Sequence, residues 1–217
     1  GMPVPWGGPP GRGHIQISEG CPCFCTFCAE SFVRKPYREK PAPVVHGEAL
    51  ALKRAMGLEA VELHSFNFNM HAGIRRILWD LVPLFHDIGL KSQRMDLIAR
   101  DPKLLEFLHA LGKANLTCGV EGVSARLRRY LGKSLPDEDL FAGFRAIIRS
   151  PIRELKVFLI ITGLEAESDW RELVRLVDFI DRTMKTAERN PRVVFSMTPL
   201  VRFPATPLEF ADAFSAK

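Results

Sequence analysis

Four of the five cysteines in this 217-residue chain fall within eight consecutive positions, and this crowding constrains the fold more than any other feature. The four are Cys21, Cys23, Cys25 and Cys28. A disulfide framework spreads its cysteines to join distant loops, whereas thiols crowded into one loop are typical of a metal or cluster site in a reducing compartment. We therefore expect a metal-binding loop and a cytoplasmic location.

The spacing of these cysteines narrows the kind of site. Cys21, Cys25 and Cys28 are separated by three and then by two residues. Three thiolates on one tight loop can bind three irons of a cubane cluster and leave the fourth iron open to a small molecule. The alternative is a zinc site made by all four cysteines, although zinc usually takes pairs of ligands from two separated loops. If the site is a cluster bound by three cysteines, Cys23 is not a ligand, and its thiol is either without a role or makes the site more prone to oxidation.

Strand-like and helical segments alternate along the chain. The strand-like runs are His14–Ser18, Ala60–His64, Ser92–Leu97, Leu116–Glu121, Val157–Thr162 and Val193–Thr198. Six such alternations predict a parallel sheet with right-handed crossovers. The first strand leads directly into the cysteine loop, which therefore lies at the carboxyl end of a strand, where barrels of this kind build their active sites.

Residues that commonly start or stop helices mark the ends of the helical segments. Gly57 and Gly89 are expected to end two helices, and Asp101 with Pro102 to begin another that ends at Gly112. Pro83 is expected to kink a helix or delay its start. Asp169 with Glu172 resembles a capping box at the start of a long helix.

One face of the predicted sheet is polar on five of the six strands. On the fourth strand, for example, Thr117 and Glu121 alternate with apolar Leu116 and with Cys118, which we expect to be buried. A sheet covered by helices on both faces would be apolar on both. We therefore predict an α/β fold, a partial (βα)6 barrel whose polar face lines a lumen. An open doubly wound sheet and an antiparallel sheet with one wet face are the alternatives, and the intervening helices disfavour the second.

Composition and charge exclude some classes of protein. Hydrophobic residues make up 47% of the chain and charged residues 25%, as in ordinary globular domains. No apolar run approaches the roughly 20 residues of a membrane span. The net charge of +5 comes partly from basic groups at 34–40 and 126–129, which we interpret as solvated faces, so that nucleic-acid binding is not expected. Residues 1–13 are interpreted as a flexible linker with a tag remnant, 14–210 as the core, and 211–217 as a truncated or frayed tail.

The cysteine segment resembles a known family signature. The three-then-two spacing, with aromatic Phe27 before the last cysteine, resembles the motif of the radical S-adenosylmethionine (SAM) superfamily. The run from Glu19 to Glu30, followed by Tyr37-Arg38, resembles the subgroup that often carries an amino-terminal cobalamin domain. Weaker similarities follow in order at strand ends, at Arg94–Asp96, Gly119–Ser124, Gly163–Ser168 and Arg202–Pro207. The resemblance covers about residues 14–210.

This resemblance implies an enzyme with a partial barrel of the radical SAM type. Cys21, Cys25 and Cys28 would hold a [4Fe–4S] cluster, whose open iron binds SAM and whose electron cleaves it. Cobalamin would act through a domain absent from this chain. The cofactor-binding residues implied are Phe27, Ser65, Asn67, Arg94, Glu121, Gly163 and Thr198. No catalytic residue and no substrate follow from the resemblance.

The individual roles differ in kind. Phe27 would pack near the adenine, Ser65 and Asn67 would hold the methionine end, and Glu121 would bind the ribose or pair with Arg94. The second strand lacks the Gly-Gly-Glu that many members use for the methionine amine. The expected partner is a reductant such as flavodoxin or ferredoxin. The reaction would be cobalamin-assisted methyl transfer or another radical transformation; the alternatives are a tRNA methylthiotransferase and a metal-stapled binding module without catalysis.

Overall fold

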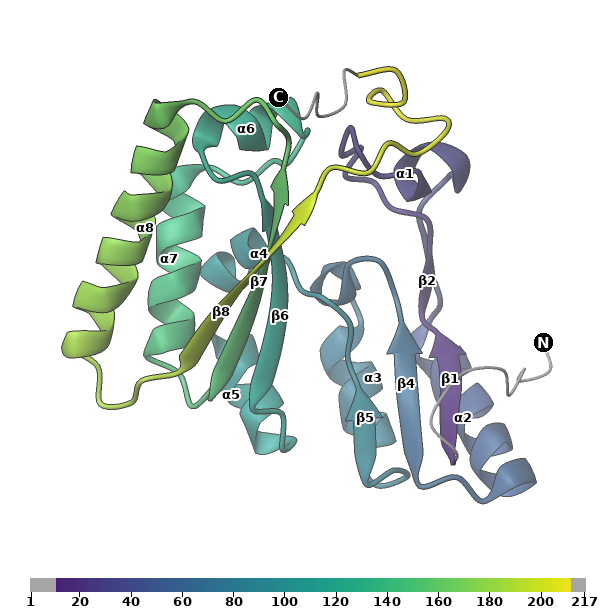
Figure 1. Cartoon of the computed structure of the whole chain (residues 1–217). Helices are drawn as coiled ribbons and strands as arrows, with labels where there is room; N and C mark the ends of the chain where they lie inside the picture. The colour runs from purple at the N-terminus through teal and green to yellow at the C-terminus, as the bar shows by residue number, and fades with distance from the viewer. Residues whose placement is uncertain (1–10, 212–217) are drawn as a thin grey trace.

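Six parallel strands form the framework of the computed structural model, which describes residues 11–211 (Figure 1). The strands are β1 (Arg12–Gln16), β4 (Ala60–His64), β5 (Asp87–Gly89), β6 (Asn115–Glu121), β7 (Glu154–Ile161) and β8 (Arg192–Pro199). They pair as two parallel sheets, in the orders β1-β4-β5 and β6-β7-β8. One parallel bridge between Gln93 and Cys118 joins the two sheets. The predicted partial (βα)6 barrel is thereby confirmed, and the antiparallel alternative is wrong for these strands.

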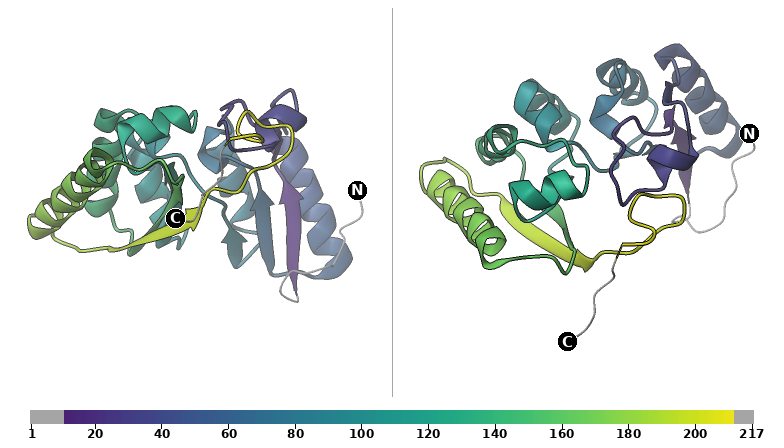
Figure 2. Two further views of the ribbon diagram at one scale, coloured as in Figure 1. Left: turned by 45° about the horizontal axis from the view of Figure 1, so that its top comes forward. Right: turned by 90° about the horizontal axis from the view of Figure 1, so that it is seen from above.

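Helices cover the outside of this framework, as the view from above in Figure 2 shows. They are α1 (Glu30–Val33), α2 (Ala42–Met56), α3 (Ile74–Leu81), α4 (Met95–Arg100), α5 (Lys103–Ala110), α6 (Ala125–Tyr130), α7 (Asp137–Ile148), α8 (Glu167–Lys185) and the 3-10 helix η1 (Phe68–Met70). A short antiparallel pair, β2 (Ser18–Glu19) and β3 (Arg38–Glu39), closes the base of the cysteine loop. None of the helices in the described part is long and apolar enough to cross a membrane.

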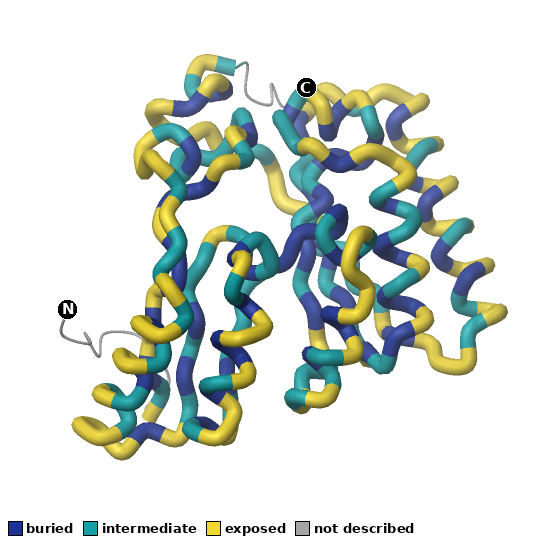
Figure 3. The backbone as a smooth tube through the Cα atoms, turned by 180° about the vertical axis from the view of Figure 1, so that it is seen from behind, coloured by how far each residue is buried: buried dark blue, intermediate teal, exposed yellow. Residues whose placement is uncertain are grey.

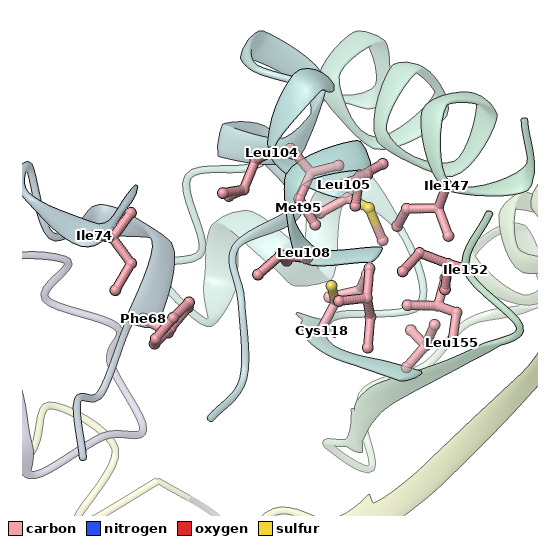
Figure 4. Packing of buried hydrophobic residues seen from close by; sticks show 14 of the residues in the cluster. Phe68, Ile74, Met95, Leu104, Leu105, Leu108, Cys118, Ile147, Ile152 and Leu155 are labelled. Carbon is pink, nitrogen blue, oxygen red and sulfur yellow. The ribbon is translucent and has the colours of Figure 1, made fainter. Parts of the chain in front are cut away.

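The core lies between the strands and the helices. Alternate residues of β6, Leu116, Cys118 and Val120, are at most 3% exposed, whereas their neighbours on the lumen side are half-buried or exposed. Figure 3 shows the same alternation along the strands, and Figure 4 shows Cys118 among the core side chains Met95 and Ile152. The predicted alternation is confirmed, and so is the burial of Cys118.

The predicted strand Ser92–Leu97 is wrong. Only Gln93 of this run makes a bridge, and the chain turns into α4 at Met95. Two interactions override the alternating pattern. Asn69 hydrogen-bonds both backbone groups of Arg94, at 2.8 and 3.0 Å, and Met95 and Ile98 are buried at helical spacing. The third strand is instead β5, which ends at Gly89, so Gly89 does not end a helix.

Other boundaries are also displaced. β1 begins at Arg12, two residues before the expected start and inside the segment interpreted as linker; residues 1–10 lie outside the described residues. Helix α3 ends at Leu81, before Pro83, because proline cannot continue it. Helix α8 begins at Glu167, so Asp169 is its third residue and reaches back to accept a hydrogen bond from Ala166 N at 2.8 Å.

Two arginines of the basic group at 126–129 stabilise the fold instead of forming a free cationic face. Arg128 is 2% exposed and forms an ion pair with Asp137. Arg126 pairs with the buried carboxylate of Asp169, and holds the pKa of that carboxyl well below its usual range. The prediction of a wholly solvated basic face is therefore wrong at Arg128.

The contact between α4 and α7 depends on a residue without a side chain. A Cβ at Gly143 would lie 2.6 Å from Met95 Sδ and 2.9 Å from the Met95 carbonyl oxygen. We expect Gly143→Ala to lower the free energy of unfolding by about 1–3 kcal/mol, because overpacking outweighs the better helix propensity of alanine. Urea unfolding followed by circular dichroism measures the change.

The control is the same substitution in another helix. Gly47 lies within α2, and a Cβ there meets nothing within 4 Å. Gly47→Ala is expected to stabilise the fold by about 0.5–1 kcal/mol, because alanine loses less entropy on entering a helix. Equal effects of the two substitutions would contradict the close packing of α4 on α7.

Candidate functional site

The cysteine loop occupies residues 20–37, between β2 and β3 at the carboxyl ends of β1 and β4. It begins at Gly20, whose φ is +71° and where a Cβ would lie 2.4 Å from the Arg34 carbonyl oxygen. Only glycine fits this left-handed turn and close approach. The start of the loop thus packs on its own end.

Two distant segments hold the middle of the loop. Thr26 N donates to Leu131 O at 3.0 Å, and Thr26 Oγ1 donates to Tyr130 O at 2.9 Å. On another side, Leu208 N donates to Thr26 O at 3.3 Å. Figure 2 shows the segment that follows β8 lying beside the cysteine loop in both views. The end of α6 and the segment after β8 therefore fix the position of the loop.

The thiols of the loop share one electrostatic neighbourhood. The neighbouring Cys23 side chain lowers the pKa of Cys21 by more than burial raises it, and the proximity of Cys21, with burial, raises the pKa of Cys23. Burial raises the pKa of Cys25, which the Lys133 ammonium partly offsets, and burial also raises the pKa of Cys28. The charge on Cys21 raises the pKa of Cys25 and Cys28 further. A positively charged metal group would relieve this repulsion between thiolates.

Side chains from the neighbouring strand ends reach these sulfurs. Asn67, which follows β4, donates its amide Nδ2 to Cys21 Sγ at 2.9 Å and lies 3.6 Å from Cys23 Sγ. Arg94 Nη1 donates to Cys23 Sγ at 2.7 Å, and the Cys23 thiol donates to Met70 Sδ at 3.8 Å. The structure thus brings together three of the predicted site residues, Cys21, Asn67 and Arg94.

Glu121 occupies a strained position at the end of β6. Its φ is +69°, the register of β6 against β7 shifts between Gly119 and Glu121, and its carboxylate curls over Gly119. Pairing with Arg94, one of the two predictions for Glu121, is wrong, because Arg94 forms an ion pair with Asp96 instead. Glu121 lies 3.5 Å from Lys133 Nζ instead, and burial raises its pKa while Lys133 opposes the shift.

A buried hydroxyl tests whether a cluster fits here. Ser31 is 1% exposed, and its Oγ has no hydrogen-bond partner at ordinary distance, yet it lies near enough to help lower the pKa of Cys21. Such a donor needs an acceptor, and cluster or ligand sulfur would supply one. Within residues 11–211, no three His, Cys, Asp or Glu side chains form a group that could hold a single metal ion. Thiols are the ligand type that iron–sulfur clusters take, so the donor set of the cysteine loop and the unpartnered Ser31 hydroxyl fit such a group in kind.

A cavity of about 1100 Å³ runs along β1 and β4. Its lining includes Ser18 and Ser65, whose hydroxyls are 2.8 Å apart, and His14 and His64, whose Nδ1 and Nε2 atoms are also 2.8 Å apart. Burial, with the positive charge of Lys91, lowers the pKa of His64. The cavity offers room for an organic molecule beside the strand that leads into the cysteine loop.

The remaining predicted residues lie apart from this group. Phe27 is half-buried in the loop itself. Gly163 follows β7 with a φ of +80°, and Thr198 is near the end of β8; both are exposed. The hydrogen bonds found among the described residues join neither Gly163 nor Thr198 to the cysteine loop.

The comparison with known protein families decides the classification. The family model of the radical SAM superfamily matches residues 15–180, more than half of the chain. The chain belongs to the radical SAM superfamily. Enzymes of this superfamily use a [4Fe–4S] cluster and SAM.

Two kinds of curated relative within the superfamily are similar in sequence. The ribosomal protein uS12 methylthiotransferase RimO of Desulforudis audaxviator is 26% identical over 186 residues, which cover 77% of this chain and 39% of that protein. The tRNA-2-methylthio-N(6)-dimethylallyladenosine synthase of a Wolbachia strain from Brugia malayi is 25% identical over 186 residues, 76% of this chain and 40% of its own. This radical SAM chain therefore spans well under half the length of these relatives.

Solved structures share the radical SAM fold. TsrM, a radical SAM methyltransferase from Kitasatospora setae solved with cobalamin and a [4Fe–4S] cluster, matches with a TM-score of 0.66 at 20% identity, over 90% of this chain and 38% of its own. The cobalamin-dependent enzyme OxsB matches with a TM-score of 0.68 at 14% identity, over 90% of this chain and 34% of its own. At these identities the likeness supports the fold alone.

Sequence reasoning did not identify several residues of the site. Lys133 and Leu208 act through contacts with other segments, whereas Ser31 is a buried serine of the loop itself, and none of the three lies in a recognisable motif. The sequence gives a weak indication of a role for Gly132, since a glycine commonly follows the end of a helix. That it also touches the cysteine loop follows only from the fold: a Cβ there would lie 3.1 Å from both Phe24 O and Thr26 N.

Gly132 provides a test of how firmly the loop must be held. We expect Gly132→Ala to reduce the iron retained after anaerobic reconstitution and desalting by roughly twofold or more, because the added methyl group displaces the backbone between Phe24 and Thr26. Iron is measured per folded chain.

Gly57→Ala is the matched control. Gly57 has a similar φ, +62° against +64° for Gly132, but a Cβ there meets nothing within 4 Å. Both variants carry the same left-handed strain of about 1 kcal/mol. Equal iron retention in the two variants would show that the contact with Gly132 does not position the loop.

Proposed function

We propose that this chain is the core of an enzyme in which Cys21, Cys25 and Cys28 hold a [4Fe–4S] cluster that cleaves SAM reductively. The observation that carries the proposal is the cysteine loop itself. It supplies three thiols from one short segment at the carboxyl ends of parallel strands, and two distant segments fix it at Thr26. Residues 14–210 are proposed to form this core.

When bound, the two cofactors would supply one-electron reductive cleavage of the sulfur–C5′ bond of SAM, which gives methionine and a 5′-deoxyadenosyl radical. The residues of the chain bind, orient and shield these groups. Asn67 donates to the Cys21 sulfur, and the hydroxyl of buried Ser31 lies beside it. Lys133 places a positive charge near Cys25 that offsets the cost of burying its thiolate.

The SAM molecule is proposed to lie over the lumen beside the loop. Ser65, which also lines the cavity, and Phe27 of the cysteine loop would contact the SAM molecule, and the carboxylate of Glu121 at the end of β6 would accept hydrogen bonds from the ribose hydroxyls. Gly163 and Thr198 mark the ends of β7 and β8 on the far side. The cavity along β1 and β4 would accommodate the substrate.

The reaction beyond SAM cleavage is proposed in two forms. One form is cobalamin-assisted methyl transfer, by analogy with TsrM and OxsB, which are described as cobalamin-bound or cobalamin-dependent radical SAM enzymes. Methylthio transfer is supported by the sequence similarity to RimO and to the tRNA-2-methylthio-N(6)-dimethylallyladenosine synthase, whose names specify a ribosomal protein and a tRNA nucleoside as substrates. Either form needs an electron donor of the flavodoxin or ferredoxin class.

Substitution of the ligands tests the proposal. Anaerobically reconstituted wild-type chain is expected to hold about four irons and four sulfides and to form 5′-deoxyadenosine from SAM and dithionite. Cys25→Ala and Cys28→Ala are expected to lower both iron content and nucleoside formation at least about tenfold, because each removes an anchoring thiolate. Iron, acid-labile sulfide, zinc and 5′-deoxyadenosine are assayed in the same preparations.

Cys118→Ala is the control for a cysteine that only packs. Cys118 is fully buried on β6 within the core, away from the lumen, so its loss is expected to reduce stability but not iron content. One zinc per wild-type chain with no nucleoside product would instead support a metal-stapled binding module.

A further inference from the structure

Cys23 is the cysteine of the loop that the proposed cluster does not use. It lies two residues from both Cys21 and Cys25 and is only half-buried. A thiolate at this position is chemically able to bind iron. A fourth thiolate on the cluster would occupy the iron that SAM needs, so the chain requires a means of keeping Cys23 away from it.

Three neighbouring side chains contact the Cys23 sulfur. Arg94 Nη1 donates to Cys23 Sγ at 2.7 Å, while Met70 Sδ lies 3.8 Å from the same sulfur and accepts from its thiol. Asn67 Nδ2 is 3.6 Å away on a further side. The sulfur therefore has hydrogen-bonding partners of both kinds and loses them if it moves to a metal.

Arg94 is itself held rigidly. It is 7% exposed, and its Nε and Nη2 form two hydrogen bonds with the Asp96 carboxylate at 3.0 and 2.9 Å. Nη2 also donates to Ser134 O at 3.3 Å, and both backbone groups of Arg94 are hydrogen-bonded by Asn69. A guanidinium fixed in this two-pronged geometry leaves Nη1 directed at the sulfur, and a buried donor of this kind keeps its partner.

We propose that Arg94 acts as a positioning residue that holds the Cys23 thiol out of the cluster and so keeps the fourth iron open to SAM. This inference rests on the proposed cluster and gives Arg94 a different role from direct binding of SAM. It also gives Cys23 a place in the site that a bystander would not have. The clamp here means Arg94, Asp96 and Cys23.

The test is a set of variants titrated with SAM under anaerobic conditions. The readouts are iron content and the change in the electron paramagnetic resonance spectrum of the reduced cluster when SAM binds. Arg94→Met is expected to keep about four irons but to raise the apparent Kd for SAM about tenfold or more, because the released Cys23 competes for the open iron. Cys23→Ala alone is expected to behave as wild type.

The double variant decides the mechanism. In Arg94→Met/Cys23→Ala no thiol remains to compete, so the apparent Kd for SAM should return to within about twofold of wild type. A double variant as weak as Arg94→Met would overturn the inference, since Arg94 would then contact SAM or support the fold directly. Wild-type SAM binding by Arg94→Met alone would also overturn it.

Two further variants guard against a failure of Arg94→Met to fold. Asp96→Asn keeps Arg94 but weakens the ion pair that orients it, and we expect a smaller rise in the apparent Kd that Cys23→Ala again reverses. Arg128→Met removes another buried, ion-paired arginine that contacts no sulfur, and should leave SAM binding unchanged. If Cys23→Ala does not restore the apparent Kd for SAM in the Asp96→Asn variant, the clamp is contradicted.

These results separate this inference from the proposed function. A wild-type chain that binds no cluster refutes the proposed function. A wild-type chain with a normal cluster and SAM response, combined with variants that show no dependence on Cys23, refutes the clamp alone.

Discussion

The position of one short loop is the constraint on which the site depends. The chain presents three thiols on one loop, although thiolates repel one another and burial disfavours their charge. It does so by hydrogen-bonding Thr26 to the end of α6 and to the segment after β8. These two anchors come from the half of the barrel formed by β6, β7 and β8, whereas the loop itself belongs to β1 and β4. The partial barrel is therefore what assembles the site.

The alternation of polar and apolar residues revealed most of this fold in advance. The parallel strands, the polar lumen and the buried Cys118 follow from period-two patterns, which report burial directly. The sequence pattern predicts the third strand at the wrong residues, Ser92–Leu97, because this run is short and its pattern is also compatible with the start of a helix. There the choice rests on Asn69, 25 residues away, which pairs with both backbone groups of Arg94. Local patterns contain no information about such a contact.

The site divides in the same way. The proposed ligands Cys21, Cys25 and Cys28 can be predicted from their spacing, because three thiols on one short loop are a recognisable local pattern. The partners of Glu121 and Arg94 were not readable: Glu121 meets Lys133 beyond α6, and Arg94 meets Asp96 and Cys23. These side chains form ion pairs and sulfur contacts that depend on which strand ends become neighbours. Their arrangement suggests that the residues around the loop control which sulfurs are available as well as where the loop lies.

The proposed function requires that three thiolates hold the cluster and leave one iron for SAM. The most direct measurement is pulsed electron paramagnetic resonance of the reduced, reconstituted chain with SAM carrying nitrogen-15 in its methionine amine. We expect a hyperfine coupling between that nitrogen and the cluster, both in wild type and in Cys23→Ala. A reduced cluster that shows no coupling to the labelled amine at saturating SAM would contradict it.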